Sequence, residues 1–373
     1  MAILQFDGLD LYGNGSVNTT AIRAAYEAAG FTSPGSSRPF VFATAYGKNA
    51  GSYGVRILTT ISSDTAANQV MLSKLIQPEQ YRGATPYAPT DVVILGFAFR
   101  LALNPTAELT IGKVGDHEVS VGIDLNMNAD GVRTQYKIEL AIWNYCEVEV
   151  SARDMKYRLW MNDLLISELP LTESVVNFDK WEVKAHYKTN GTAGQSMMDA
   201  DDYYLLDGSV SANNVQKVRL GKVNVAVRLP TADSEVGFTP NAGSNNFSRV
   251  AEAVPNGDST YVSSGVPGTK DLYSNPAVLT VVDDNAIVAV AVAVSARQTE
   301  PDSLSLSPTI KNGGQTFSAD RMAIRASLYT SEKGIFELDP ATGQRWKPAG
   351  VQTATFGQTI LDRATPPPPV TGP

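Results

Sequence analysis

Two aspartates near the N-terminus have the residue type and spacing of a catalytic or metal-binding pair. Asp7 and Asp10 stand three residues apart in "LQFDGLDLYG", with Gly8 between them. Residues three apart on a strand point to opposite faces, so the carboxylates converge on a cation only if Gly8 bends the chain. Calcium prefers six to eight oxygen ligands, whereas the neighbours here are leucine, phenylalanine and tyrosine. We interpret the two aspartates as turn or bulge residues beside Gly8 at the start of a strand.

A second acidic pair, Glu147 and Glu149, lies in "CEVEVSARD". Glycoside hydrolysis needs two carboxylates roughly 5 to 9 Å apart across the scissile bond, and residues two apart on a strand share a face. Ser151 and Ala152 follow, so no third acid continues the register. A solvent-facing polar row on an alternating strand explains the pair, and we predict no catalytic residue in the chain.

The remaining reactive residue types are scarce. The 2 histidines, His117 and His186, are far apart, and Cys146 is the single cysteine. This set provides neither a ligand cluster nor a catalytic triad. The stretch "DADDYYLLD" gathers acids without EF-hand spacing; an acidic loop is the favoured interpretation and a calcium site the alternative. We predict no metal and no cofactor.

Aromatic residues are the last candidates for a contact surface. Aromatic rings stack on sugar faces, and four tyrosines fall in loops rich in glycine and proline. They are Tyr46, Tyr53, Tyr81 and Tyr87. They could face a glycan or a neighbouring subunit, and the sequence leaves both open. In contrast, Trp143, Trp160 and Trp181 lie in strand patterns, and we assign them to the core.

Composition excludes several classes of protein. The net charge is −8, only 18% of residues are charged, and no run of lysine and arginine concentrates positive charge. A nucleic-acid partner is therefore not expected, because phosphate binding needs a basic face. The most apolar run, "AIVAVAVAV", has nine residues, too few to span a bilayer, so we expect no membrane insertion. The opening "MAILQFDG" has no signal-peptide pattern.

The elements that must position these residues are mostly strands. Alternating, β-branched segments separated by Gly, Pro, Asn and Asp indicate an all-β protein. Hairpin turns are predicted at Gly115-Asp116 and Asn162-Asp163. The run at 286–294 is predicted to be a central strand with a close neighbour on its alanine side. A strand is also predicted at 91–103, and helices at 18–30, 69–76 and within 340–360.

The first 208 residues resemble the concanavalin A-like (laminin G-like) jelly-roll sandwich. "LQFDGLDLYG" resembles the opening strand of that family, "KYRLWMNDLLISE" its hairpin, and "DDYYLLDGS" its closing strand. The resemblance implies that the opening and closing strands lie in the same sandwich. We therefore expect a concanavalin A-like β-sandwich at 1–208, a second, smaller β-sandwich-like domain at 209–360, and an extended Pro-rich tail at 361–373.

The whole chain also resembles a type of virion protein from tailed bacteriophages. The shared segments are "FDG…YG", "YLLDGS…NN", "FTPNAGSNNFSRVAEAVPNGDSTYVSS", "GTKDLY" and "DPATGQRW". The resemblance implies a non-enzymatic structural component of the virion, made in the host cytoplasm. A tail, fibre or baseplate protein that contacts host surface glycans is the first expectation, and a capsid decoration or head fibre the second. The alternative from another class is a polysaccharide-degrading glycoside hydrolase.

The expected partners follow from that resemblance. We expect the chain to assemble with itself, as a trimer, and with other virion proteins. A surface poor in charge and rich in Gly, Asn, Ser and Thr suits assembly, because little charge must be desolvated.

Overall fold

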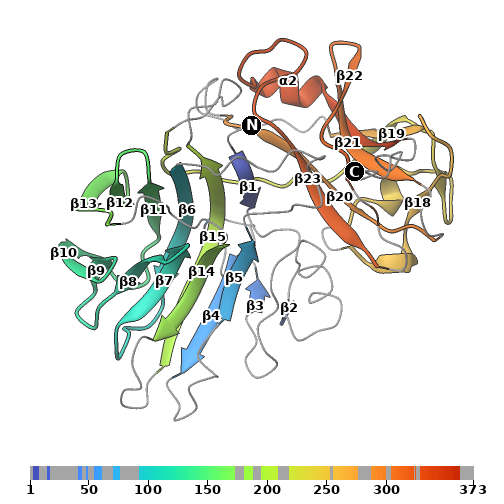
Figure 1. Ribbon diagram of the computed structural model, residues 1–373. Coiled ribbons are helices and arrows are strands. Elements are labelled where there is room, and N and C mark those ends of the chain that lie inside the picture. Colours follow the sequence, from blue (N-terminus) through green and yellow to red (C-terminus); the bar gives the residue numbers. More distant parts are fainter. Residues whose placement is uncertain are drawn as a thin grey trace, which may run out of the picture. The chain divides into compact units, whose positions relative to one another are not determined.

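The computed structural model describes most of the chain after residue 91 and shorter segments before it (Figure 1). The described residues are 3–7, 15–16, 41–43, 48, 54–60, 70–75, 92–172, 180–187, 195–208, 218–252, 255–275, 287–299, 304–322, 324 and 328–361. The chain divides into two compact units. The first comprises Met1–Glu79 with Ala84–Val227, and the second Gln80–Gly83 with Arg228–Pro373.

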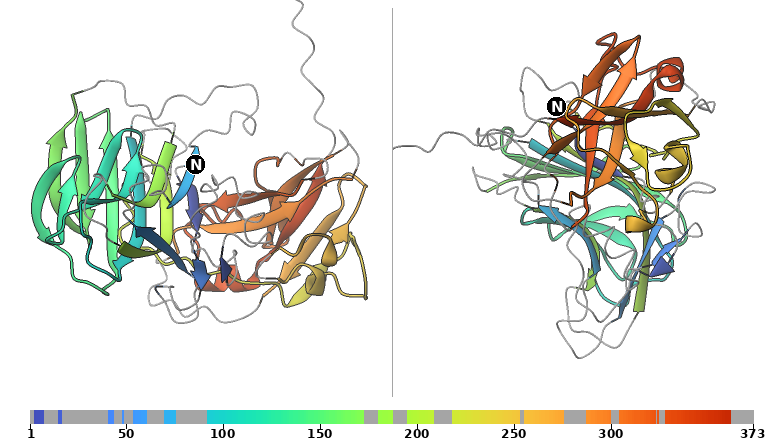
Figure 2. Two further views of the ribbon diagram at one scale, coloured as in Figure 1. Left: turned by 90° about the horizontal axis from the view of Figure 1, so that it is seen from below. Right: turned by 90° about the vertical axis from the view of Figure 1, so that its right-hand side faces the viewer.

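The first unit contains two antiparallel sheets, as expected for a β-sandwich (Figures 1 and 2). The nine-stranded sheet has the order β13-β12-β11-β6-β15-β4-β3-β2, with β1 also paired to β15. Its strands are β1 (Ile3–Asp7), β2 (Gly15–Ser16), β3 (Val41–Ala43), β4 (Gly54–Thr60), β6 (Val92–Leu101), β11 (Asn144–Ser151), β12 (Lys156–Met161), β13 (Leu164–Pro170) and β15 (Gln195–Asp207).

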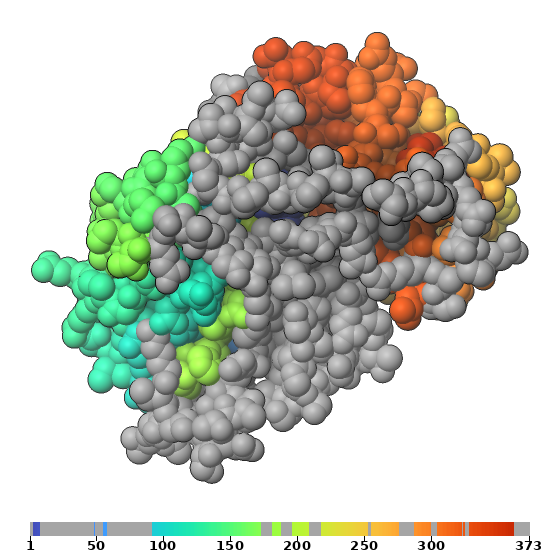
Figure 3. Space-filling model, viewed as in Figure 1, coloured from blue at the N-terminus to red at the C-terminus, as the bar shows by residue number. Residues whose placement is uncertain are grey.

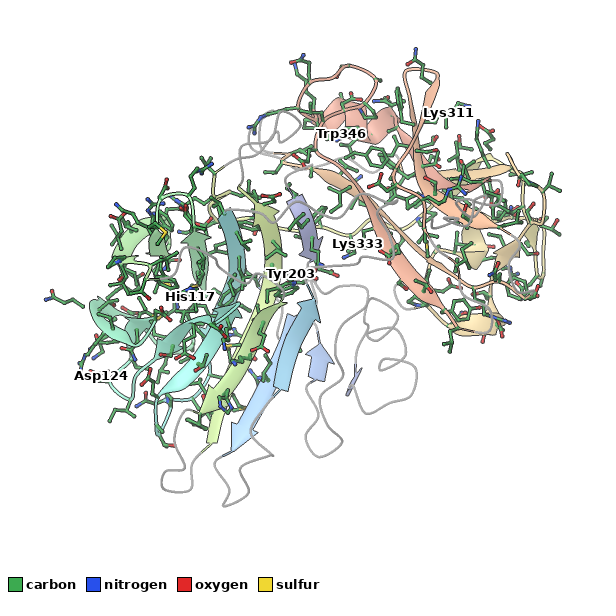
Figure 4. All side chains as sticks on the ribbon, in the orientation of Figure 1. His117, Asp124, Tyr203, Lys311, Lys333 and Trp346 are labelled. Carbon is green, nitrogen blue, oxygen red and sulfur yellow. The ribbon has the colours of Figure 1, made fainter. Side chains whose placement is uncertain are left out.

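The second sheet of this unit has six strands in the order β10-β9-β8-β7-β14-β5. They are β5 (Val70–Leu75), β7 (Leu109–Val114), β8 (His117–Val121), β9 (Asn126–Ala129), β10 (Val132–Lys137) and β14 (Lys180–Tyr187). The core lies between the sheets. At its centre Trp181 of β14 is fully buried, and its ring lies 4.9 Å from that of Tyr203 on β15, which Figure 4 labels.

The predicted pairing of the opening and closing segments is confirmed. Strand β1 runs antiparallel to β15, with Phe6 opposite Tyr204 and Asp7 opposite Tyr203. "LQFD" and "YYLLD" thus lie side by side in the nine-stranded sheet.

Both predicted hairpin turns are also confirmed. Asn162 (φ 50°) and Asp163 (φ 70°) take the left-handed conformations that a two-residue turn between β12 and β13 requires. Gly115 (φ 55°) opens the turn between β7 and β8. Strand β6, predicted at 91–103, is buried along nearly its whole length between β11 and β15.

One of the predicted elements of this unit is wrong. The segment 69–76 is not a helix: Val70–Leu75 forms β5 and pairs with β14. The segment 218–227 forms no strand, and its amides at Leu220, Gly221 and Val225 donate to side chains. The predicted helix at 18–30 and the Pro-rich tail lie outside the described residues.

The second unit is built on a five-stranded antiparallel sheet with the order β16-β19-β24-β21-β22. Its strands are β16 (Ala232–Glu235), β19 (Lys270–Ser274), β21 (Ser305–Asn312), β22 (Gln315–Ser318) and β24 (Thr355–Leu361). Two-stranded sheets join β20 (Val290–Ala296) to β23 (Thr330–Phe336) and β17 (Thr239–Pro240) to β18 (Val262–Ser263).

The helices of this unit are short. They are the 3₁₀ turns η3 (Phe247–Arg249) and η4 (Gly257–Ser259) and the helix α2 (Pro348–Thr353), which lies in the predicted helical region.

A compact core joins β20 to the five-stranded sheet. Val292 of β20 packs in one cluster with Ile310 of β21, with the fully buried Trp346 and with α2. The Trp346 Nε1 donates to the Phe336 carbonyl oxygen at 2.8 Å. The second unit is thus β-sandwich-like, as predicted. The expectation for the run 286–294 was only half right: it forms a strand, but Ala293 is exposed and β20 pairs only with β23 among the described strands.

In the second unit, Arg297 forms an ion pair with Asp258 of η4. Arg297 donates to Asp258 through Nε at 3.0 Å and Nη2 at 2.8 Å, and Tyr329 donates its hydroxyl at 2.8 Å. These hydrogen bonds, from Arg297 first and then from Tyr329, lower the pKa of Asp258.

We expect Arg297→Ala to return the pKa of Asp258 toward its ordinary value. A carboxyl group with a lowered folded-state pKa stabilises the fold at pH values above its unfolded pKa, and that stabilisation is lost as the pH falls through the folded pKa. The variant should therefore be less stable than the wild type at pH 7, and the difference should vanish in acid. A carboxyl ¹³C NMR titration checks the pKa, and identical titrations in both proteins would contradict the expectation.

Candidate functional site

Glu147 and Glu149 lie on β11 and face outward from the nine-stranded sheet, because Cys146, Val148 and Val150 point into the core. The two acids do share a face, as their spacing predicts. The prediction that they form a solvent-facing row is wrong for Glu147, which is only 1% exposed.

Glu147 is buried by a network of hydrogen bonds. Its carboxylate accepts from the Tyr204 hydroxyl, from Arg219 Nη1 at 2.7 Å and from the Gly221 amide at 2.8 Å. The Tyr204 hydroxyl also accepts from the Leu220 amide at 3.0 Å. All of these partners come from β15 or from the segment 218–227.

Glu149 has a separate set of partners. It pairs with Arg158 of β12, which also bonds to Asp154 at 3.3 Å and to Glu168 of β13 at 2.8 Å. Burial raises the pKa of Glu149, and the charge of Arg158 opposes this. Glu147 thus pairs with Arg219, and Glu149 pairs with Arg158.

The segment 218–227, which we call the strap, belongs to the first unit. Asp202 of β15 accepts from the Val225 amide at 2.8 Å and from Lys48 Nζ at 3.0 Å. The same Nζ donates to the Val223 carbonyl oxygen and to Asn224 Oδ1, both at 2.8 Å. Burial raises the pKa of Asp202, and the charge of Lys48 opposes it. Hydrogen bonds to Glu147 of β11 and to Asp202 of β15 therefore hold the strap in place.

The stretch "DADDYYLLD" is not an acidic loop, because it lies within β15. Its first acid, Asp199, is fully buried and bonds to Arg56 Nε at 2.6 Å and to Arg100 Nη2 at 2.6 Å. Arg100 in turn lies over the ring of Trp143 at 5.0 Å. Within the described residues no group of three or more His, Cys, Asp or Glu is placed to hold a metal ion.

Two of the three tryptophans assigned to the core lie elsewhere. Trp181 is in the core as predicted. Trp143 and Trp160 are half-buried, and each lies against a guanidinium, that of Arg100 and that of Arg219 (5.3 Å) respectively. They are therefore part of the ionic network rather than of the apolar core.

The structure does not bring the other sequence candidates together. His117 contacts Asp130 through Nδ1 at 2.9 Å, whereas His186 is opposite Thr110, toward the other end of β7. Cys146 is buried, and burial raises the pKa of its thiol well above the ordinary value.

Asp7 is buried on β1. Its proposed partner Asp10 and the four loop tyrosines lie outside the described residues. The tyrosines are Tyr46, Tyr53, Tyr81 and Tyr87.

Sequence analysis missed a polar row across the six-stranded sheet. Thr110, Ser120 and Asn128 are opposite one another on β7, β8 and β9. Thr110 donates to Glu118 at 3.3 Å and Ser120 donates to Glu108 at 2.5 Å. The row could have been found from the polar residues at every second position of these strands. Its hydroxyls are already bonded to carboxylates and all three side chains are buried, so the row offers neither a nucleophile nor an exposed binding surface.

No family model matches the sequence, and a search of curated proteins found no match. Among solved structures, a sialidase matches 57% of this chain and 19% of its own, with 9% identity and a TM-score of 0.38. The cellulose-induced protein Cip1 matches 52% of this chain and 93% of its own, with 10% identity and a TM-score of 0.37.

A GH131 β-glucanase catalytic domain from Podospora anserina is similar over 49% of this chain and 84% of its own, with 17% identity and a TM-score of 0.34. The chain thus spans about a fifth of the sialidase but most of the other two proteins. Matches with such low identities and TM-scores carry no information about the activity of this chain. In the described part of the chain, no helix is long and apolar enough to cross a membrane.

Proposed function

We propose that the chain is a non-enzymatic structural component of a tailed phage particle, and specifically a tail, fibre or baseplate protein. The proposal rests on the hydrogen bonds and ion pairs that the acidic side chains form within the first unit. Glu147 and Asp202 hold the strap, and Glu149 and Asp199 pair with arginines across neighbouring strands. The acids that could have formed a hydrolytic pair instead fix the outer surface of the sandwich.

This arrangement suits a building block. A glycosidase needs two carboxyl groups open to the same sugar, whereas Glu147 is enclosed by Tyr204, Arg219 and the strap. The resemblance of "FDG…YG" and "YLLDGS" to virion proteins supports the same assignment, since their described residues include Phe6 and Asp7 of β1 and Tyr204 to Asp207 of β15.

Quantitative mass spectrometry of purified particles tests the proposal. We expect the chain to copurify with the particle at a fixed stoichiometry of tens of copies or fewer, which is the range of tail components. Hundreds of copies would assign the chain to the capsid surface instead. Release of sugars from capsular polysaccharide by the purified chain, abolished in Glu147→Gln or Glu149→Gln, would contradict the non-enzymatic assignment.

A further inference from the structure

Six of the exposed large apolar side chains of the first unit gather at one end of the sandwich. They lie in the loops after β6 and β8, in the loop before β11, and at the start of β13. We call this set the apolar end: Leu103, Ile123, Leu140, Ile142, Leu164 and Leu165. Figure 4 labels Asp124, the residue after Ile123, and Figure 3 shows the colours of β9, β10, β12 and β13 on the surface of this unit. Val132, at the opposite end, and Val218, in the strap, are the remaining exposed large apolar residues among the described residues of this unit.

Backbone hydrogen bonds hold the loops of the apolar end next to one another. The Ala141 amide donates to the Leu101 carbonyl oxygen at 2.8 Å, and the Ile138 amide donates to that of Leu125 at 3.0 Å. Asn162, in the turn before β13, donates from Nδ2 to Asn144 Oδ1 at 3.0 Å. The loop 138–143 therefore joins the other three segments into one surface.

The exposure of these residues is unusual for a free surface. Ile123 is 61% exposed, Leu164 59% and Ile142 52%. Together the six side chains expose a few hundred Å² of apolar surface, about the size of the largest patch on a typical monomer, and such patches are often interaction sites. The apolar end thus has the character of the centre of an interface.

The charges around the apolar end indicate what covers it. Asp163 is neutralised by Arg219 at 2.9 Å, and Asp124 by Arg133. Lys137 and Glu139 are both exposed, lie on either side of Ile138, and form no ion pair with any described residue. When two identical surfaces meet about a two-fold axis, residue i of one copy contacts residue j of the other and the reverse. Lys137 of each copy can then pair with Glu139 of the other.

We propose that the apolar end is the two-fold interface of a homodimer of this chain. The inference rests on the proposed function as a structural component of a particle, and it names a surface through which the chain would assemble with itself. Stable interfaces bury about 800 Å² on each partner, so the polar loops around the six apolar side chains must take part in the contact as well. Because the surface meets itself, this contact gives dimers rather than the trimer expected from the resemblance.

Sedimentation velocity on the full chain tests the interface. We expect a dimer at tens of micromolar that becomes monomeric in the double variant Ile142→Glu with Leu164→Glu. Both side chains are more than half exposed, so the variant should keep the wild-type circular dichroism spectrum. The control is Val132→Glu, which adds one glutamate at an exposed apolar position (49%) at the opposite end and should remain dimeric.

A charge swap tests the two-fold geometry. Lys137→Glu alone and Glu139→Lys alone each place like charges opposite one another, and each should weaken dimerisation by about tenfold. The double swap restores opposite charges across the axis and should bring the dissociation constant back to within about threefold of the wild type. If the double swap were as weak as the two single changes combined, the two-fold pairing would be wrong.

Other outcomes would overturn the proposal. A wild-type chain that stays monomeric at 100 µM would do so. So would a monomer that binds phosphatidylcholine vesicles and loses this binding in the Ile142→Glu, Leu164→Glu variant, because the surface would then belong to a lipid partner. The two proposals fail separately: a dimer absent from particles contradicts only the virion assignment, and a virion component that is monomeric in solution contradicts only the interface.

Discussion

Replacing Glu147 by alanine is expected to lower the free energy of unfolding of the first unit by about 3 kcal/mol, the cost of removing one partner from a buried ion pair. The Tyr204 hydroxyl and the Gly221 amide lose their shared acceptor, and Arg219 keeps only Asp163. Because Gly221 lies in the strap, amide hydrogen exchange of residues 218–227 should also become faster. Urea unfolding followed by circular dichroism measures the first effect.

Two variants separate the charge from the hydrogen bonds. Glu147→Gln keeps an oxygen acceptor and should cost less than Glu147→Ala. Glu149→Ala removes the other acid of the pair, but Arg158 retains Asp154 and Glu168, so the cost should stay below about 1 kcal/mol. If Glu147→Ala were as mild as Glu149→Ala, Glu147 would not hold the strap.

Gly357→Ala should have the largest effect in the second unit, about 3 kcal/mol. Gly357 lies on β24 opposite Leu272 of β19. An added Cβ would overlap the backbone carbonyl oxygen of Asp271 and lie 3.1 Å from Leu272 Cα. Backbone atoms cannot move aside without disrupting the ladder between β19 and β24, and overpacking of this kind typically costs 1 to 3 kcal/mol or more.

Scanning calorimetry measures this effect. Each unit has its own core, so we expect separate unfolding transitions, and Gly357→Ala should lower the midpoint of one of them by roughly 5 to 10 °C. Gly265→Ala is the matched control, because its added Cβ would meet no atom within 4 Å. A similar small change in both variants would show that the close approach at Gly357 does not exist in solution.

Local sequence was sufficient where local chemistry determines the structure. Asn162-Asp163 predicts a tight turn because both residues tolerate the left-handed conformation that they adopt. Alternation in "CEVEVS" correctly placed Glu147 and Glu149 on one face of a strand. The pairing of β1 with β15 was predicted from the family resemblance, since the two strands are two hundred residues apart.

Sequence alone failed where a distant partner decides the outcome. The segment "VMLSKL" contains good helix formers, yet it is a strand because β14 pairs with it. The contacts of the strap were not predicted either, because its amides bond to Glu147, Tyr204 and Asp202, which lie far away in the sequence. The burial of Glu147 could not be predicted, because the residues that cover it follow it by more than fifty positions in the chain.

The central claim is that the chain is a structural part of a phage tail, and a reconstruction of the particle tests it most directly. We predict density for both β units at the tail, fibre or baseplate, with the strap closed over Glu147 and the first unit packed against protein neighbours. Particles of the same phage that contain no such density, together with free chain that degrades host polysaccharide, would contradict the account.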